Sequence, residues 1–145
     1  MTLRTPLLLG ALLLGGALVR PAQADEAEAE SCLRNKIWEG YKEGWSVRTA
    51  TAATLGQGEY RVYVVTLQAD TEYRILSCAD GTAVNVDLVI HDADGNVLAS
   101  EDATDRQPIV EYKPIATDTY YVAVHARSLK DPNGRAGVGM AVTFR

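Results

Sequence analysis

The sequence predicts a mainly β fold, a sandwich or a barrel of antiparallel strands. From Gly58 onward, short runs rich in β-branched and aromatic residues recur at intervals of about ten residues. Segments rich in Gly, Asp, Asn and Pro, which favour turns, separate these runs. The strand-like runs do not alternate with helical ones, so the pattern excludes a doubly wound α/β fold.

The clearest pattern is a predicted hairpin at residues 84–100. Its first strand alternates apolar with more polar side chains, as a half-buried strand does: Val84, Val86, Leu88 and Ile90. Asp92 to Asn96 then form a tight turn, where Gly95 can adopt a positive φ. The other predicted strands are 59–68, 72–78, 109–112, 119–126 and 138–145. In the last of these, four apolar side chains should share one face: Val138, Met140, Val142 and Phe144.

Residues 1–24 have the features of a secretory signal peptide. Arg4 precedes an apolar run at 7–19, and Ala22-Gln23-Ala24 fits the small-residue rule for cleavage. The run is shorter than the about 20 residues that a membrane span needs, and an uncleaved anchor is the alternative. We expect cleavage after Ala24, no lipid anchor, and a mature chain of 121 residues without a membrane span. The protein would then be periplasmic or secreted.

The mature chain divides into two predicted parts. Residues 25–57 should form an N-terminal helix and a connector, and residues 58–145 a β-sandwich domain. The acidic stretch 25–30 is either disordered or the first turn of the helix, where acidic groups suit the helix dipole. The stretch 46–57, rich in Thr and Ala, is interpreted as the connector.

The predicted helix covers residues 31–45. Leu33, Ile37 and Tyr41 follow the spacing of an amphipathic helix, and Gly44 is a candidate C-cap.

Three aromatic residues of this segment, Trp38, Tyr41 and Trp45, are candidates for stacking on a ligand such as a sugar ring. The alternative is that they cover one end or face of the sheet, because large aromatic side chains contribute strongly to burial.

Cys32 and Cys78 are the two cysteines of the sequence. An exported chain enters an oxidising compartment, where an even number of cysteines favours a disulfide. Two buried free thiols are the alternative. The sequence has no Cys-x-x-Cys motif, so neither a redox motif nor a cysteine zinc site is supported.

The net charge disfavours two classes of partner. It is −5 for the full sequence and −7 without residues 1–24, which contain Arg4 and Arg20 but no acidic residue. Nucleic acids and anionic membranes bind basic patches, so neither is expected as a partner. A negative charge of this size also serves solubility.

The acidic turn of the hairpin suggests a calcium site. It does not match an EF-hand loop, because Val97 stands where Gly is required and Ala103 where Glu is required. A site of another type could use carboxylates of this turn and the following loop: Asp92, Asp94, Glu101, Asp102 and Asp105. Asp residues that form turns need no metal, so a structural role is the alternative.

The sequence contains no recognisable catalytic constellation. Ser77 and Ser128 lack the context of a nucleophilic serine. The two histidines, His91 and His125, fall on the strand face opposite the apolar stripe. A zinc or copper site would need them adjacent across the sheet, with a carboxylate such as Asp87 beside them. A hydrolase with a carboxylate pair stays open, because such pairs have no spacing signature.

Four stretches carry a family resemblance. They are Leu-x-Ala-Asp-x-x-Tyr-x-Ile at 67–75, Asp-Leu-x-Ile with Asp-x-x-Gly at 87–95, an acidic loop with Pro108 at 102–110, and Tyr-x-Val-x-Val at 120–124. From Leu55 to Arg145 their order resembles the bacterial pre-peptidase C-terminal domain, a secreted jelly-roll β-sandwich. Asp70 and Asp118 depart from the pattern, because that family usually has Gly in both turns.

The resemblance implies a jelly-roll sandwich of seven or eight strands. Such domains usually accompany secreted proteases or other exported enzymes, and some bind matrix polymers or calcium. This chain has no room for a protease, so only the role of a binding module carries over. We expect an exported, non-enzymatic module that binds a protein or polysaccharide outside the cytoplasm. A small extracytoplasmic hydrolase and a structural envelope protein are the alternatives.

Overall fold

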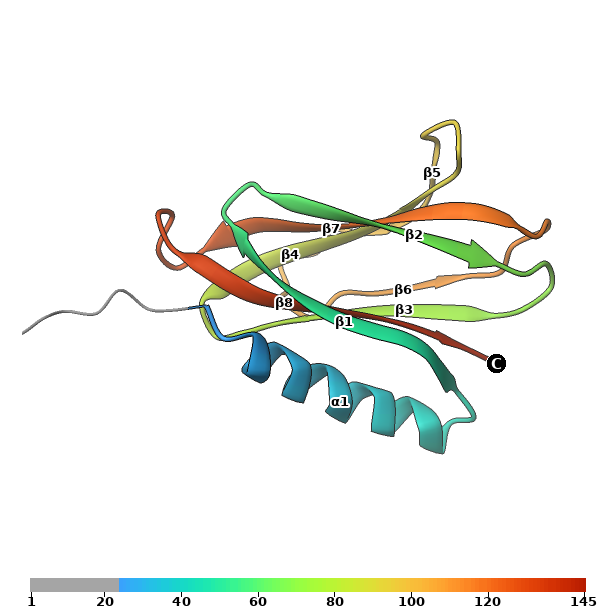
Figure 1. Cartoon of the computed structure of the whole chain (residues 1–145), viewed down its shortest axis with the longest axis horizontal. Coiled ribbons are helices and arrows are strands. Elements are labelled where there is room, and N and C mark those ends of the chain that lie inside the picture. Colours follow the sequence, from blue (N-terminus) through green and yellow to red (C-terminus); the bar gives the residue numbers. More distant parts are fainter. Residues whose placement is uncertain (1–23) are drawn as a thin grey trace, which may run out of the picture.

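Eight strands form two antiparallel sheets that pack face to face, and one helix lies on the outside of one sheet (Figure 1). The structure is a computed structural model that describes residues 24–145. The predicted signal peptide lies outside these residues apart from Ala24, and its cleavage stays a prediction. In chain order the elements are α1 (Glu26–Lys42), β1 (Ser46–Gly56), β2 (Tyr60–Leu67), β3 (Tyr73–Ala79), β4 (Ala83–His91), β5 (Val97–Glu101), β6 (Ile109–Tyr112), β7 (Asp118–Leu129) and β8 (Arg135–Phe144).

The strand order is that of a jelly roll. One sheet, here sheet A, has the order β1-β8-β3-β6, and the other, sheet B, has the order β2-β7-β4-β5. Every connection between consecutive strands passes from one sheet to the other, except the predicted β4–β5 hairpin. The predicted mainly β sandwich with one N-terminal helix is therefore confirmed.

The core between the sheets follows the predicted alternation of side chains. Val86, Leu88 and Ile90 of β4 are fully buried there. Val84 was expected beside them but is 43% exposed, because the pairing of β4 with β7 shifts register on both sides of Asn85. From β8, the expected face supplies Val138, Met140 and Val142 to this core, and Phe144 is partly buried against it.

The stretch 46–57 is not a connector, as its composition suggested. Ser46–Gly56 forms β1, which pairs with β8 along almost its whole length. The strand signal was hidden because one edge of β1 is free and its first half is exposed, so it has no apolar alternation there. The sandwich therefore begins twelve residues before the boundary expected at residue 58.

Helix α1 begins at the acidic stretch. The side chain of Asp25 caps it by accepting a hydrogen bond of 2.9 Å from the backbone N–H of Glu28. Gly44, at a φ of +90°, follows the helix end as predicted. Tyr41 was expected on the buried face, but it is 64% exposed, and Gly40 is buried instead. The buried stripe begins at Ala29. Three helical turns of about 3.6 residues each lead from there to residue 40, so Gly40 rather than Tyr41 faces the sheet.

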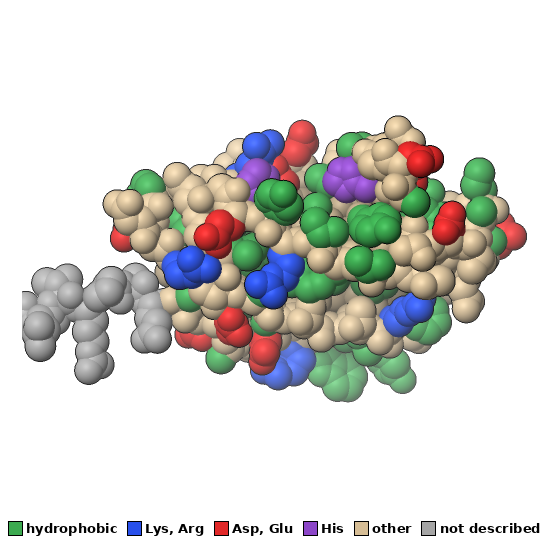
Figure 2. All heavy atoms as spheres, turned by 45° about the horizontal axis from the view of Figure 1, so that its top comes forward, with side chains coloured by type: hydrophobic (Ala, Val, Ile, Leu, Met, Phe, Trp, Pro, Cys, Tyr) green, Lys and Arg blue, Asp and Glu red, His purple; other side chains and the backbone are tan. Residues whose placement is uncertain are grey.

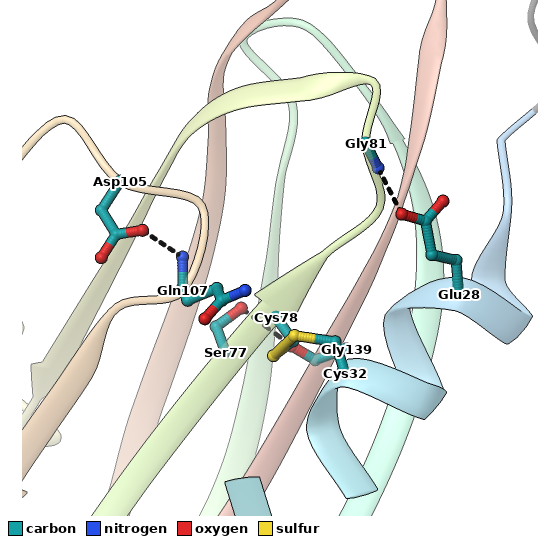
Figure 3. Close-up of a disulfide and its surroundings, with 8 residues drawn as sticks. All are labelled: Glu28, Cys32, Ser77, Cys78, Gly81, Asp105, Gln107 and Gly139. Carbon is teal, nitrogen blue, oxygen red and sulfur yellow. Dashed lines mark hydrogen bonds between the residues drawn. A yellow bond between two sulfur atoms is a disulfide. The ribbon is translucent and has the colours of Figure 1, made fainter. Parts of the chain in front are cut away.

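A disulfide fixes α1 to sheet A. Cys32 of α1 and Cys78 of β3 are bonded, with their Cα atoms 5.9 Å apart, which confirms the predicted bridge (Figure 3). Beside it, Leu33 packs with Leu76 and Ala141 in a second, smaller apolar cluster under the helix.

Small residues on the outer face of β8 allow α1 to lie close. A Cβ atom built on Gly137 would be 2.4 Å from the carbonyl oxygen of Asp25, and one on Gly139 would be 3.3 Å from Cδ2 of Leu33. Backbone atoms at the start of α1 therefore contact Gly137 directly.

Replacing Gly137 by Ala should lower the free energy of unfolding by about 1–3 kcal/mol, because the added methyl group would push against backbone that cannot rotate away. The control Gly139→Ala should cost less, since its nearest neighbour is the flexible end of a side chain. Urea unfolding of both variants and the wild type measures the difference. Equal stability of Gly137→Ala and the wild type would contradict the close contact.

Asp80 is a buried carboxylate that joins the helix to both β3 and β8. Its Oδ2 accepts hydrogen bonds from the backbone N–H groups of Asp25, at 2.7 Å, and Gly137, at 2.8 Å. Its Oδ1 accepts one from the N–H of Thr82, at 2.9 Å. Burial acts to raise the pKa of Asp80, but the hydrogen bonds from Thr82, Asp25 and Gly137 outweigh it and hold the pKa below 3.8.

This depressed pKa makes a prediction about acid stability. Asp80 contributes stability that is complete above the unfolded pKa of about 3.9 and is lost as the pH falls through the lower folded value. Asp80→Asn should remove this part of the pH dependence and lower the free energy of unfolding at neutral pH by about 2 kcal/mol. Unfolding measured from about pH 2 to about pH 7 tests this. The control Asp94→Asn, in an exposed turn, should keep the wild-type profile, and a wild-type profile in Asp80→Asn would contradict the assignment.

Candidate protein-binding surface

In the described structure, the outer face of one sheet is covered by the helix, and that of the other sheet is not. Helix α1 packs on β8, β3 and β1, all strands of sheet A (Figure 1). The outer face of sheet B has no comparable cover among residues 24–145. Side chains on that face therefore meet solvent.

Strand β2 places a row of apolar side chains on this uncovered face. Tyr60 is 66% exposed, Val62 45% and Val64 65%. The register of sheet B sets half-buried residues of β7 and β4 beside this row. We call the whole set the outer apolar face: Tyr60, Val62, Val64, Val89, Tyr121, Ala123 and His125. Figure 2 shows this side of the molecule, where hydrophobic side chains gather beside the two histidines.

One end of the outer apolar face is polar. His125 is opposite Tyr60 on one side and Asp87 on the other, and its ring meets the Tyr60 ring edge-on at 6.2 Å between centroids. Asp87 is buried although it lies on the outer face, and its Oδ2 accepts a hydrogen bond from Nε of Arg127. Its Oδ1 has no hydrogen-bond partner among residues 24–145. An ion pair between a buried carboxylate and an exposed guanidinium group therefore borders the apolar row.

The sequence did not single out this surface. The alternation of residues in β2 predicts a strand with two different faces. It does not show which of the two sheets the helix covers, and so it does not show which face stays exposed. That choice follows from long-range pairing, which no local pattern encodes.

The structure separates the three candidate stacking aromatics. Trp38 and Tyr41 are more than 60% exposed on α1, with their rings nearly perpendicular at 83°. Trp45 is buried, and the guanidinium groups of Arg74 and Arg145 stack on its ring, 4.4 and 4.5 Å from the ring centroid. The three rings therefore do not form one exposed platform, and Trp45 has a structural role.

The candidate calcium ligands mainly bind their own loops. Asp92 accepts hydrogen bonds from the N–H of Asp94 and from the N–H and side-chain amide of Asn96, at 2.8–2.9 Å. These bonds hold the pKa of Asp92 below 3.8, and the bond from the Asn96 side chain contributes most. Glu101 and Asp105 likewise accept backbone hydrogen bonds two residues onward (Asp105 in Figure 3).

Acidic and histidine side chains do not gather into a metal site in the described structure. Between residues 24 and 145, no three of the His, Cys, Asp and Glu side chains are placed to hold a metal ion. His91 is opposite Tyr121 and His125 is opposite Asp87, so the two histidines are not cross-strand neighbours. A calcium site that uses Asp92, Asp94, Glu101, Asp102 and Asp105 stays a prediction.

The calcium hypothesis has a direct test. A ligand that binds only the native state raises the melting temperature by mass action. If these loops bind calcium, melting in millimolar calcium should occur at a higher temperature than in EDTA, and Asp105→Asn should reduce the shift. Identical melting curves with and without calcium would rule the site out.

The sandwich is similar to a known domain family over part of its length. Residues 59–126 match the bacterial pre-peptidase C-terminal domain. The match runs from the start of β2 into β7 and includes all four stretches of the predicted resemblance. Pre-peptidase C-terminal domains are non-catalytic, in agreement with the expectation of a non-enzymatic module.

Solved structures show the same fold in another protein. The periplasmic lysozyme inhibitor of g-type lysozyme from Aeromonas hydrophila, PliG, superposes with a TM-score of 0.51 at 12% sequence identity. The match covers 67% of this chain and 85% of that one. No curated protein matches the sequence. In the described part of the chain, no helix is long and apolar enough to cross a membrane.

Proposed function

We propose that the mature chain is an exported, non-enzymatic module that binds a protein partner outside the cytoplasm. The observation that carries this proposal is the outer apolar face of sheet B, which stays exposed while the outer face of sheet A lies beneath a helix. Contiguous exposed apolar surface on a soluble domain marks interaction sites.

The chemistry of this face suits a protein more than a polysaccharide. Its exposed row combines one aromatic and two β-branched side chains, Tyr60, Val62 and Val64, which can bury against a partner's apolar surface. Polysaccharides are held by flat aromatic platforms and polar groups, and the perpendicular rings of Trp38 and Tyr41 do not form a flat platform. The ion pair of Asp87 and Arg127 supplies a charged rim.

Three observations support a location outside the cytoplasm. The Cys32–Cys78 disulfide persists in oxidising compartments. Residues 1–24 have the pattern of a cleaved signal peptide, which would leave the chain periplasmic or secreted. PliG, which has this fold, is a periplasmic inhibitor of an enzyme, so the fold occurs outside the cytoplasm in a protein with a protein partner.

The test compares two charge substitutions on the purified mature chain. Val64→Glu places a carboxylate in the exposed apolar row of β2 and should weaken capture of the partner by about tenfold or more. The control Ile115→Glu changes an apolar residue that is 94% exposed in a loop elsewhere, and it should bind like the wild type. Immobilised proteins are exposed to the extracytoplasmic fraction of the producing cells, and a g-type lysozyme is the first purified candidate.

Circular dichroism confirms that both variants are folded. If the two variants and the wild type retain the same proteins equally, the outer apolar face is not the binding surface.

A further inference from the structure

Strand β2 is a long and regular edge of sheet B. The two sheets have four edge strands among the described residues: β1, β6, β2 and β5. β6 and β5 span only 4 and 5 residues, and β1 carries a register irregularity between Val47 and Thr49. β2 spans 8 residues without Pro, and its pairing with β7 has no irregularity. Long, regular edges of this kind pair readily with another chain.

The hydrogen-bond pattern shows which backbone groups of β2 are open. The N–H of Ala126 donates to the carbonyl of Glu59 at 2.9 Å. In an antiparallel ladder alternate residues bond to the same neighbour, so residues 61, 63 and 65 face β7. Tyr60, Val62, Val64 and Thr66 therefore direct their N–H and C=O groups to the open edge.

One of these four positions is already closed. Nη1 of Arg48, on β1, donates a hydrogen bond to the carbonyl of Thr66. Tyr60, Val62 and Val64 remain, and each offers one N–H and one C=O without a strand partner in the described structure. A strand that binds here needs to match three alternate residues.

We propose that the occupant of this edge is β2 of a second copy of the chain. The two strands run antiparallel about a two-fold axis at Val62, with Val62 opposite Val62 and Tyr60 opposite Val64. In this register each open N–H and C=O of one copy meets one of the other. The carbonyl of Thr66 keeps its bond to Arg48.

Side-chain charge favours this register over its neighbours. On the outer face it pairs only apolar residues, and on the inner face it sets Arg61 opposite the ring of Tyr63 of the second copy, a favourable cation–aromatic pair. If the register shifted by one step in one direction, Arg61 would lie opposite Arg61 of the second copy, and the two positive charges would repel. A shift in the other direction would need the Thr66 carbonyl that Arg48 already binds. β2 is therefore self-complementary in one register.

Pairing would join the two B sheets into one continuous sheet. The outer apolar faces of both copies would then form a single larger surface, still open to a partner. The contact is a strand edge rather than a broad face, so we expect a reversible dimer with a Kd of about 1–100 µM. This inference goes beyond the proposed function and does not depend on it.

Sedimentation of the mature chain without any partner tests the dimer. The wild type should sediment as a monomer–dimer equilibrium. Val62→Lys brings two like charges together at the axis and should raise the Kd by about tenfold or more. The control Val97→Lys changes a valine that is 60% exposed on β5, at the other edge of the same sheet, and should dimerise like the wild type.

Cysteine cross-linking tests the register, with Cys32 and Cys78 still paired. Under mild oxidation Val62→Cys should give a covalent dimer, because the two copies of residue 62 face each other within bridging distance. Tyr60→Cys alone should not, since residue 60 faces residue 64, whereas the double substitution Tyr60→Cys with Val64→Cys should.

Three results would overturn the proposal. They are a monomeric wild type at about 1 mM, well above the expected Kd, an undiminished dimer in Val62→Lys, and equal cross-linking of Tyr60→Cys and Val62→Cys. A chain that is monomeric alone but protects its β2 amides when a partner binds would assign the edge to that partner. In that case the dimer fails and the proposed function stands.

Discussion

The docking of α1 onto β3 and β8 is the constraint on which the rest of the structure depends. The apolar side chains of Leu76 and Ala141 lie on the outer face of sheet A, and without the helix they would meet water. The helix contains Gly40, which disfavours a helix formed alone, and most helical stability in proteins comes from packing rather than from propensity. Its stability therefore comes from the sheet, and the sheet needs the helix as a cover.

One covalent link and one polar link hold the helix on sheet A. The Cys32–Cys78 bridge joins residues 46 positions apart, and a closed loop of that length stabilises the fold by about 4 kcal/mol on the chain-entropy estimate. Asp80 binds the first residue before the helix and the strand beneath it through the same carboxylate oxygen. The glycine at position 137 leaves room for that contact. Helix α1 thus covers the outer face of sheet A, whereas the outer face of sheet B has no such cover among residues 24–145.

Much of the fold could be predicted from local sequence patterns. The period-two alternation of β4 and β8 identified the core residues, because one face of each strand is buried. The paired cysteines identified the bridge, because no other cysteine competes. β1 was missed because its first half is exposed and carries no alternation. Tyr41 was assigned to the wrong helix face, because spacing alone does not fix how a helix rotates on a sheet.

The candidate surface was less accessible to prediction than the fold. Val62 and Val64 have the same residue type as valines of the core, so only the tertiary arrangement shows that they are exposed. The aromatic residues were candidates because of their residue type, yet Trp45 is buried and stacks with Arg74 and Arg145, which lie 29 and 100 residues away in the sequence. A surface or contact that depends on the pairing of distant strands cannot be recognised from a local sequence pattern.

Amide hydrogen exchange before and after reduction of Cys32–Cys78 tests the central claim most directly. If the bridge holds α1 as a cover on sheet A, reduction should strongly accelerate exchange at α1 amides such as those of Leu33 and Ile37. Amides of β7, in the centre of sheet B, should keep their protection. Unchanged protection of α1 after reduction, or an equal loss in α1 and β7, would contradict this account.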